Sequence, residues 1–570
     1  MNDSLGSPSG HGATERGLLH AAAQTATPPS QKVDAPPPRF EGRFGRMFPG
    51  LRGAAFFQED MDSLAEAMSA EDEGEATPET EVDSEENRGL PAGYTYFGQF
   101  IDHDITLDAV SLSMKQEALN ETENFRTPAL DLDSLYGRGP ADQPYMYADN
   151  GSFQMSDRAL KAGAGGPVMT RDLPRLKGRA VIGDKRNDEN VIVSQLHGLF
   201  MRLHNKFIGE GLSFDEARRQ VQWHYQWLAL YDYLPRIVGP QIVHDVLPHT
   251  QLGGTLATHK PQLKLYSWDK FPFMPVEFAS AAYRYGHSMV RPVYRLSRAD
   301  DVGDAGRLPV FRPPVGGEAL NGFREFPDTW GIDWSLFFET DGRKLGTSFT
   351  GKDRIQPAYK IDTSLVFPLK TLPEFSDADG KPKPSGAVNA LAARNIRRGL
   401  MLQLPSGQAV ARYMIEKGVP GVQVLDDDEL LIGKADADGF DDAEPISVPA
   451  VFEGGAMVKP PVRRSMQDSA PLWFYVLAEA RHTWRAAATK ALADAGAPSG
   501  GARAEVINAV PVRLGPAGGR IVAETLIGLV IGDENSFLNA ASEFVPRFGN
   551  PTHADYFARF TFGDLLAFVA

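Results

Sequence analysis

The sequence predicts a mainly α protein, built as one large helical domain with long loops and little β-structure. Several segments repeat apolar residues at the three- and four-residue spacing of an amphipathic helix. Few stretches show the two-residue alternation of a half-buried strand. No internal repeat divides the 570 residues into similar units. We therefore expect a single helical domain over residues 89–570.

The composition excludes some functions and some kinds of metal or catalytic site. The chain has 58 Lys and Arg against 74 Asp and Glu, a net charge of −16, which disfavours a general nucleic-acid binder. It contains no Cys, so disulfides, thiolate nucleophiles and Cys-ligated metal centres are excluded. Any metal must therefore be held by His, carboxylates, carbonyl oxygens or a prosthetic group.

The N-terminal part differs in character from the rest of the chain. Residues 1–38 are rich in Ser, Gly, Ala, Pro and Thr and are expected to form a disordered tail. Residues 39–88 are expected to form an aromatic packing arm and an acidic loop. The start lacks the pattern of a conventional secretory signal, and no stretch reaches the roughly 18 apolar residues of a spanning helix. We expect a soluble protein, cytoplasmic or exported by an unrecognised route.

Helical segments follow one another along the predicted domain. Residues 189–211 space their apolar side chains at helical intervals from Ile192 to Phe207. Ser213 and Glu216 then form a capping box that begins the next helix. Further helices are predicted over 276–290, 387–402, 406–418, 471–492 and 519–538.

The first motif whose residues could take part in catalysis or binding is YTYFGQFIDHDITLD, residues 94–108. Gln99 and His103 are four residues apart and share one helical face, whereas Asp102 and Asp104 turn about 100° to either side. The surrounding residues are apolar and aromatic, so these polar groups need partners in or near a core. The spacing favours a functional interpretation over a surface turn.

A second motif, TPALDLDSLYG, places oxygen-bearing groups at alternate positions of a loop. The positions are Thr127, Ala129, Asp131 and Asp133. Alternate oxygen ligands suit Ca²⁺, which takes roughly six to eight oxygens. An Asx-rich turn explains the same spacing equally well.

The segment GDKRNDEN brings Arg186 and Glu189 to the same side of a predicted helix start. The dipole of a helix favours acids there, which explains Glu189 but not Arg186. On the helix that follows, His197 and His204 have no carboxylate between them at ligand spacing, so we interpret them as core residues.

Two later segments contain a histidine and an asparagine that are candidate functional residues. In AAYRYGHSMVRP, His287 lies among small and apolar residues, with Arg284 three positions before it. A lone histidine in such a place is more often a core residue than a ligand. In ARNIRRGLMLQLPSGQ, Asn395 and Arg398 share a helical face.

Taken together, these five motifs resemble the animal-type haem peroxidases of the peroxidase–cyclooxygenase superfamily. The resemblance covers about residues 89–537, and the motifs occur in the order of the family. It implies a haem peroxidase fold. Because the chain has no Cys and no recognisable signal, a bacterial relative of myeloperoxidase and peroxidasin is expected.

The resemblance implies a role for each motif. On the distal side of the haem, His103, Arg186 and Gln99 would be catalytic. On the proximal side, His287 would ligate the haem iron and Asn395 would support it, with Arg398 and Arg284 near the haem edge. Asp102 and Glu189 occupy the positions that carry ester links to haem in mammalian members. Calcium would be bound by Asp104, Thr127, Ala129, Asp131 and Asp133.

The implied activity is that of a peroxidase containing haem b. It would reduce hydrogen peroxide through a ferryl intermediate and oxidise phenols, halide or thiocyanate, as in a response to oxidative stress. One alternative is a haem-dependent fatty-acid dioxygenase of the same superfamily, with Tyr283 or Tyr285 as the radical site. Another is a non-catalytic, calcium-binding or interaction protein that kept the fold. No nucleic-acid partner and no membrane span are expected, and oligomeric state is left open.

Overall fold

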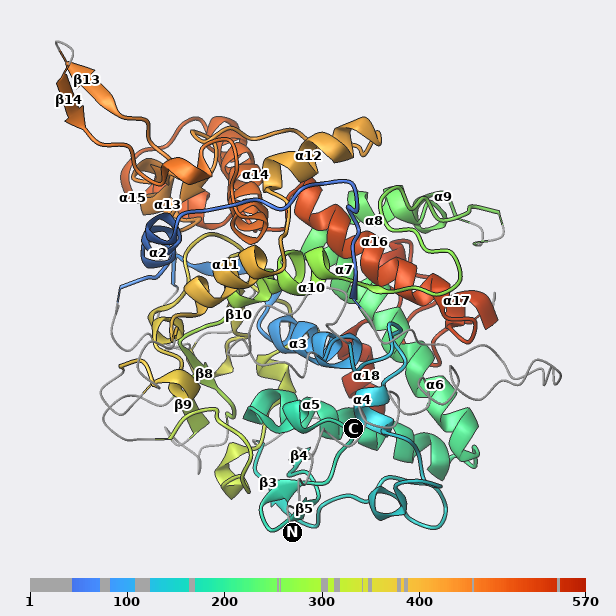
Figure 1. Ribbon diagram of the computed structural model, residues 1–570. Coiled ribbons are helices and arrows are strands. Elements are labelled where there is room, and N and C mark those ends of the chain that lie inside the picture. Colours follow the sequence, from blue (N-terminus) through green and yellow to red (C-terminus); the bar gives the residue numbers. More distant parts are fainter. Residues whose placement is uncertain are drawn as a thin grey trace, which may run out of the picture.

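The computed structural model describes most of the chain (Figure 1). The described residues are 44–71, 83–107, 124–162, 170–253, 256, 258–298, 306–311, 318–340, 342–346, 351–376, 381–383, 388–453, 456–540 and 544–570. The predicted tail, residues 1–38, lies outside them, as do parts of the predicted arm and acidic loop at 39–43 and 72–82.

Helices make up most of the regular structure, which confirms the predicted mainly α class. Their bounds are α2 Gln58–Ala67, α3 Gly93–Ile105, α4 Asp133–Tyr136, α5 Val191–Gly209, α6 Phe214–Trp227, α7 Leu234–Val238, α8 Pro240–Val246, α9 His249–Leu252, α10 Val276–Ser280, α11 Leu391–Met401, α12 Gly407–Glu416, α13 Ala437–Asp441, α14 Leu472–Asp494, α15 Gly500–Asn508, α16 Pro516–Gly532, α17 Phe537–Ala540 and α18 Phe562–Val569.

The strands are short, and every sheet within the described residues has two strands. The only parallel pair among them joins β1 (Phe44–Gly45) to β7 (Met274–Pro275). The antiparallel pairs are β2 (Glu86–Pro91) with β10 (Pro357–Tyr359), β3 (Ala159–Leu160) with β4 (Thr170–Arg171), β5 (Arg175–Leu176) with β6 (Arg179–Ala180), β8 (Val293–Arg295) with β9 (Arg307–Pro309), β11 (Leu431–Ile432) with β12 (Glu444–Pro445), and β13 (Val451–Glu453) with β14 (Ala456–Lys459).

Helix α6 begins with the capping box that the sequence predicts. The Ser213 side chain accepts from the backbone N–H of Glu216, and the Glu216 carboxylate accepts from the backbone N–H of Ser213. Helix α6 then continues into a π-helical turn, η4 (Leu228–Tyr233). That turn carries Tyr233 to the wall of the central cavity described below.

Two predicted helices differ from the structure. The helix expected over 276–290 is wrong, because the backbone of Ala281 leaves the helical region after α10 and a 3₁₀ helix, η5 (Ala282–His287), follows. The helix expected over 519–538 is too long at its end, since α16 ends at Gly532, where Asp533 becomes extended. Its long apolar run, residues 521–530, is buried throughout, as expected of an interior helix.

Helix α3 lies in the middle of the fold (Figure 1). It contacts α5, α4, η5 and a short 3₁₀ helix, η3 (Lys185–Asp188). Most of its side chains are buried, including Phe97, Phe100 and Ile101, which are fully covered. A helix fixed this firmly can hold polar groups in set positions. No helix within the described ranges is both long and apolar enough to cross a lipid bilayer.

Candidate functional site

A cavity of about 540 Å³ lies between α3 and η5. Six of the predicted site residues line it: Gln99, Asp102, His103, Glu189, Arg284 and His287. Among the described residues, Arg186, Asn395 and Arg398 are not part of the wall. The sequence motifs thus converge on one place, although the segments that carry them lie up to 188 positions apart, from Gln99 to His287.

On the α3 side of the cavity, Gln99 and His103 lie one helical turn apart and face Glu189. The Gln99 side-chain N–H donates to Glu189 Oε1, and Asn190 donates to Gln99 Oε1 at 3.1 Å. His103 Nε2 lies 3.6 Å from the same Glu189 oxygen. Burial raises the pKa of Glu189, although the charges of His103 and Arg186 oppose the rise.

Behind His103 lies a partner that the sequence analysis did not identify. His103 Nδ1 is 2.8 Å from Asn187 Oδ1, and Asn187 Nδ2 is 3.0 Å from His197 Nδ1. All three side chains are buried. The partnership joins η3 to helices α3 and α5 through space, so helical spacing could not reveal it. His204, the other histidine of α5, bonds instead to Tyr136 and Gly151.

Arg186 contacts helix α3 without lining the cavity. Its guanidinium donates to the backbone carbonyl of His103 at 2.8 Å and to the Asp184 carboxylate at 2.8 Å. Burial opposes ionisation of Asp184, but the nearby charges of Arg186 and Arg126 hold its pKa far below the ordinary value. Arg186 is therefore held as a fixed positive charge beside α3.

On the opposite wall, His287 is the last residue of η5. Its Nδ1 lies 2.9 Å from Asn395 Nδ2, and no described residue forms a hydrogen bond with its Nε2. Burial, reinforced by the charge of Arg284, lowers the pKa of His287 to about 3. The ring is therefore neutral, as a metal ligand must be. Arg398, also on α11, donates to Ser280 at 3.4 Å.

Three predicted calcium ligands form a compact carboxylate cluster. One oxygen from each of Asp104, Asp131 and Asp133 lies within 4.8 Å of the others. Asp104 is fully buried and accepts from the backbone N–H groups of Leu132 and Ser134 at 3.1 and 3.4 Å. Burial and the two neighbouring carboxylates raise the pKa of Asp104 well above its ordinary value.

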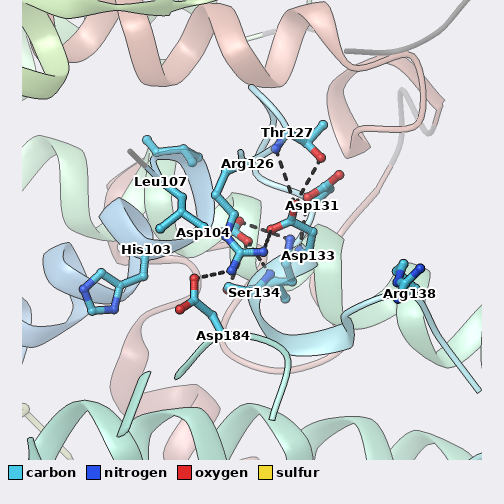
Figure 2. Close-up of polar contacts among 12 residues, drawn as sticks. His103, Asp104, Leu107, Arg126, Thr127, Asp131, Asp133, Ser134, Arg138 and Asp184 are labelled. Atoms are coloured by element: carbon cyan, nitrogen blue, oxygen red, sulfur yellow. Dashed lines mark hydrogen bonds and ion pairs between the residues drawn. The ribbon is translucent and has the colours of Figure 1, made fainter. Parts of the chain in front are cut away.

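Figure 2 shows that adjacent residues of α3 serve different places: His103 points to one side of the helix and Asp104 to the other, toward the carboxylates. Arg126 lies between Asp133 and Asp184 and forms ion pairs with both. Because Asp184 also binds Arg186, a chain of charges joins the carboxylate cluster to the carbonyl of His103. Neither Arg126 nor Asp184 can be identified from the sequence, since single charged residues carry no periodic signal.

The remaining predicted calcium ligands lie on the same loop. The Thr127 hydroxyl donates to Asp133 Oδ2 at 3.2 Å, and the backbone N–H of Ala129 donates to the Thr127 carbonyl at 2.8 Å. Leu132, just before α4, adopts a left-handed backbone with φ of 56°. This turn directs the backbone N–H of Leu132 at Asp104.

Comparison with known proteins identifies related sequences. Residues 114–311 match the family model for animal haem peroxidase. The chain is 33% identical over 140 residues to a peroxidase-like protein of Margaritifera margaritifera, covering 22% of this chain and 16% of that protein. It is 27% identical over 198 residues to mouse myeloperoxidase, covering 30% of this chain and 26% of that protein. The chain thus spans less than a third of the length of these curated relatives.

A solved structure with similarity is peroxidase A from Dictyostelium discoideum, with 14% identity, a TM-score of 0.49, and coverage of 92% of this chain and 93% of that one. The family match includes Arg186, Glu189 and His287, whereas His103 and Asn395 lie outside it and reach the same site through the fold. Over residues 114–311, about a third of the chain, the sequence is therefore similar to the animal haem peroxidases.

Proposed function

We propose that the chain is a haem-dependent peroxidase that reduces hydrogen peroxide and oxidises small donors. One observation carries the proposal: His103 and His287 line the same cavity from two different elements, each with Nδ1 held by a buried asparagine. The family implies haem. The cavity volume of about 540 Å³ also lies within the roughly 300–1,000 Å³ that is typical of ligand sites.

The proximal residues fit a haem ligand. His287 is neutral, lines the cavity, and has an Nε2 that no described residue bonds. A ligating imidazole commonly donates its other N–H to a fixed acceptor. Asn395 contacts that other nitrogen, and a half-turn of its amide presents Oδ1 as the acceptor. We therefore assign His287 as the iron ligand and Asn395 as its support.

The distal residues fit proton transfer. Bound haem would supply the redox chemistry of peroxide cleavage. His103 Nε2, which faces the cavity, would take a proton from one peroxide oxygen and return it to the leaving oxygen. Gln99 and Glu189, joined by a hydrogen bond, would orient the peroxide beside it. Arg186 would contribute fixed positive charge near the developing negative charge.

Acidic and basic residues around the cavity suit the periphery of a haem. Asp102 and Glu189 both line the cavity, and we propose them as the carboxylates able to form ester links to haem. Arg284 lines the cavity and Arg398 lies on α11, one turn after the residue that supports His287. We propose that these two guanidinium groups pair with the haem carboxylates.

We also propose a structural calcium ion at the carboxylate cluster. Three carboxylates whose ligand oxygens lie within 4.8 Å of one another concentrate negative charge in one place, which a divalent cation would neutralise together with Arg126, the ion-pair partner of Asp133. The Thr127 hydroxyl and the Ala129 carbonyl would add oxygen ligands. Because Asp104 adjoins His103, the ion would fix the distal helix.

A second candidate activity is fatty-acid dioxygenation, favoured by a tyrosine cluster on the cavity wall. Tyr283 donates to the Tyr233 hydroxyl at 3.1 Å, and the hydroxyls of Tyr233 and Tyr285 also bond to each other. All three line the cavity. A tyrosine held in this way could carry a radical. However, Arg284 beside them makes that part of the wall charged, which suits a polar haem edge better than an apolar chain.

The deciding experiment compares two activities of the haem-loaded protein. Donor oxidation is measured with hydrogen peroxide and a phenol, iodide or thiocyanate, and oxygen uptake is measured with an unsaturated fatty acid. The proposal predicts donor oxidation that persists in Tyr283→Phe and Tyr285→Phe. Rapid oxygen uptake that either variant abolishes, with negligible donor oxidation, would establish the dioxygenase instead. Inertness in both assays would favour the non-catalytic alternative.

A further inference from the structure

A buried hydrogen-bonded chain runs away from the cavity behind His103. It leads from His103 on α3 to Asn187 on η3 and then to His197 on α5, with contacts of 2.8 and 3.0 Å. Asn187 and His197 are fully buried, and neither lines the cavity. Any effect that they have on a ligand in the cavity must therefore pass through His103.

The first contact determines which nitrogen of His103 carries the proton. Asn187 presents its carbonyl oxygen, Oδ1, to His103 Nδ1, and an oxygen can only accept. Nδ1 must therefore carry the hydrogen of a neutral ring. The other nitrogen, Nε2, then has a free lone pair toward Glu189 and the cavity. This is the tautomer that can accept a proton there.

The second contact couples the orientation of the Asn187 amide to the tautomer of His197. Asn187 Nδ2 can only donate, so in this orientation the neutral His197 ring accepts at Nδ1 and carries its hydrogen on Nε2. Burial lowers the pKa of His197 to about 3, so the ring stays neutral at ordinary pH. The remaining nitrogen, Nε2, is buried without a partner among the described residues. Among the described residues, the Asn187 amide is therefore the hydrogen-bonding partner of this ring.

Reversal of the amide would have a chemical consequence at the cavity. If Nδ2 of Asn187 faced His103, Nδ1 would have to accept, and Nε2 would carry the hydrogen. A protonated Nε2 cannot take a proton from a ligand in the cavity. The reversed amide would also turn its oxygen toward His197 Nδ1, so His197 would have to carry its hydrogen on Nδ1, and the two rings can change tautomer only together.

We infer that Asn187 and His197 are positioning residues that hold His103 in the tautomer able to accept a proton in the cavity. The inference rests on the proposed function, in which His103 is the base that receives the proton of peroxide. It gives a functional role to Asn187 and His197, although neither residue lines the cavity. A purely structural role, in which they only tie η3 to α3 and α5, is the interpretation to exclude.

Four variants and one control separate the two roles. His197→Phe removes the acceptor but keeps a ring, whereas His197→Gln keeps an oxygen acceptor. Asn187→Leu removes both contacts, whereas Asn187→Asp keeps an acceptor for His103. The control is His204→Phe, a buried histidine on the same helix α5 whose partners are Tyr136 and Gly151. It reports the cost of losing a buried histidine without a link to His103.

The first measurement uses haem-loaded protein with a full Soret band. The rate of cyanide binding, which needs a proton acceptor but no turnover, is recorded beside the rate of reaction with peroxide. We expect Asn187→Leu and His197→Phe to lower both rates about tenfold or more, because a misoriented base loses much of its contribution. His197→Gln and Asn187→Asp should recover most of each loss. The control should lower the melting temperature and leave both rates within about twofold.

The second measurement reads the tautomer directly in protein without haem. The ¹⁵N shifts of the His103 ring, assigned by their absence in His103→Gln, should show a protonated Nδ1 in the wild type and a mixture in His197→Phe. If the wild type fails to bind haem, the proposed function fails, but this measurement still tests the inference. The inference is overturned if the tautomer is unchanged in His197→Phe. Equal rate losses in His197→Phe and the control would overturn it too.

Discussion

The two walls of the central cavity hold their histidines in different ways. His103 lies on helix α3 and is tied on one side to Asn187 and on the other, through its carbonyl, to Arg186. His287 ends a 3₁₀ helix, and its ring has a single hydrogen-bonding partner among the described residues, Asn395. A group that must move protons needs a fixed ring and tautomer, whereas a metal ligand can also be oriented by the metal itself.

This difference predicts that substitutions on the two walls of the cavity have different effects. Damage to the distal network should slow chemistry while leaving the cofactor bound. Damage to the proximal side should release the cofactor.

Removal of the distal base should have the largest effect. His103→Ala removes the group that accepts the proton of peroxide, and we expect the rate of reaction with peroxide to fall roughly 10²-fold or more. Stopped-flow spectroscopy of the haem-loaded variant measures this rate. The Soret absorbance should be retained, because His103 is not the proposed iron ligand. A variant that reacts with peroxide at the wild-type rate would show that the base lies elsewhere.

Removal of calcium should have a smaller effect, which is a loss of stability measured as a lower melting temperature. An ion at 100 times its dissociation constant stabilises the fold by about 2.7 kcal/mol, so a chelator should lower the melting temperature. Asp133→Asn should lower it too and should abolish the response to chelator. Asp438→Asn, which changes an exposed carboxylate outside the cluster, is the matched control. Identical melting curves with and without chelator, with no metal by elemental analysis, would exclude the site.

The smallest effect should come from a buried histidine of α5 that serves neither wall. Burial lowers the pKa of His204 from 6.5 to about 4, so the unfolded chain binds more protons between these pH values. Its contribution to stability is therefore present above pH 6.5 and is lost as pH falls toward 4. In His204→Gln, the dependence of the unfolding free energy on pH should weaken by up to about 1.4 kcal/mol per pH unit. Parallel curves for the variant and the wild type would contradict this account.

Helical spacing predicts the parts of the site that lie on one helix. Gln99 and His103 share a face of α3 and line the same cavity, and Asp104 turns away to the carboxylates, as a rotation of about 100° per residue requires. The 3₁₀ form of η5 does not follow from the apolar spacing over 276–290, because it begins where the backbone of Ala281 leaves the helical region.

Partners brought together from distant segments could not be predicted from spacing. Asn187 meets His103 across 84 positions, and Arg126 meets Asp184 across 58. The resemblance to a family placed Arg186 in a catalytic role, but it did not indicate that the guanidinium binds the His103 carbonyl and Asp184 outside the cavity wall. Such contacts follow from tertiary packing, which local sequence patterns do not encode.

The central claim is that His287 holds a haem in the cavity opposite His103. The most direct measurement is the ultraviolet–visible spectrum of the purified protein during titration with haem, for the wild type and for His287→Ala. We predict a saturable Soret band at one haem per chain in the wild type, and loss of haem or of the native ferric spectrum in His287→Ala. No Soret band in the wild type, or an unchanged spectrum and turnover in His287→Ala, would contradict the claim.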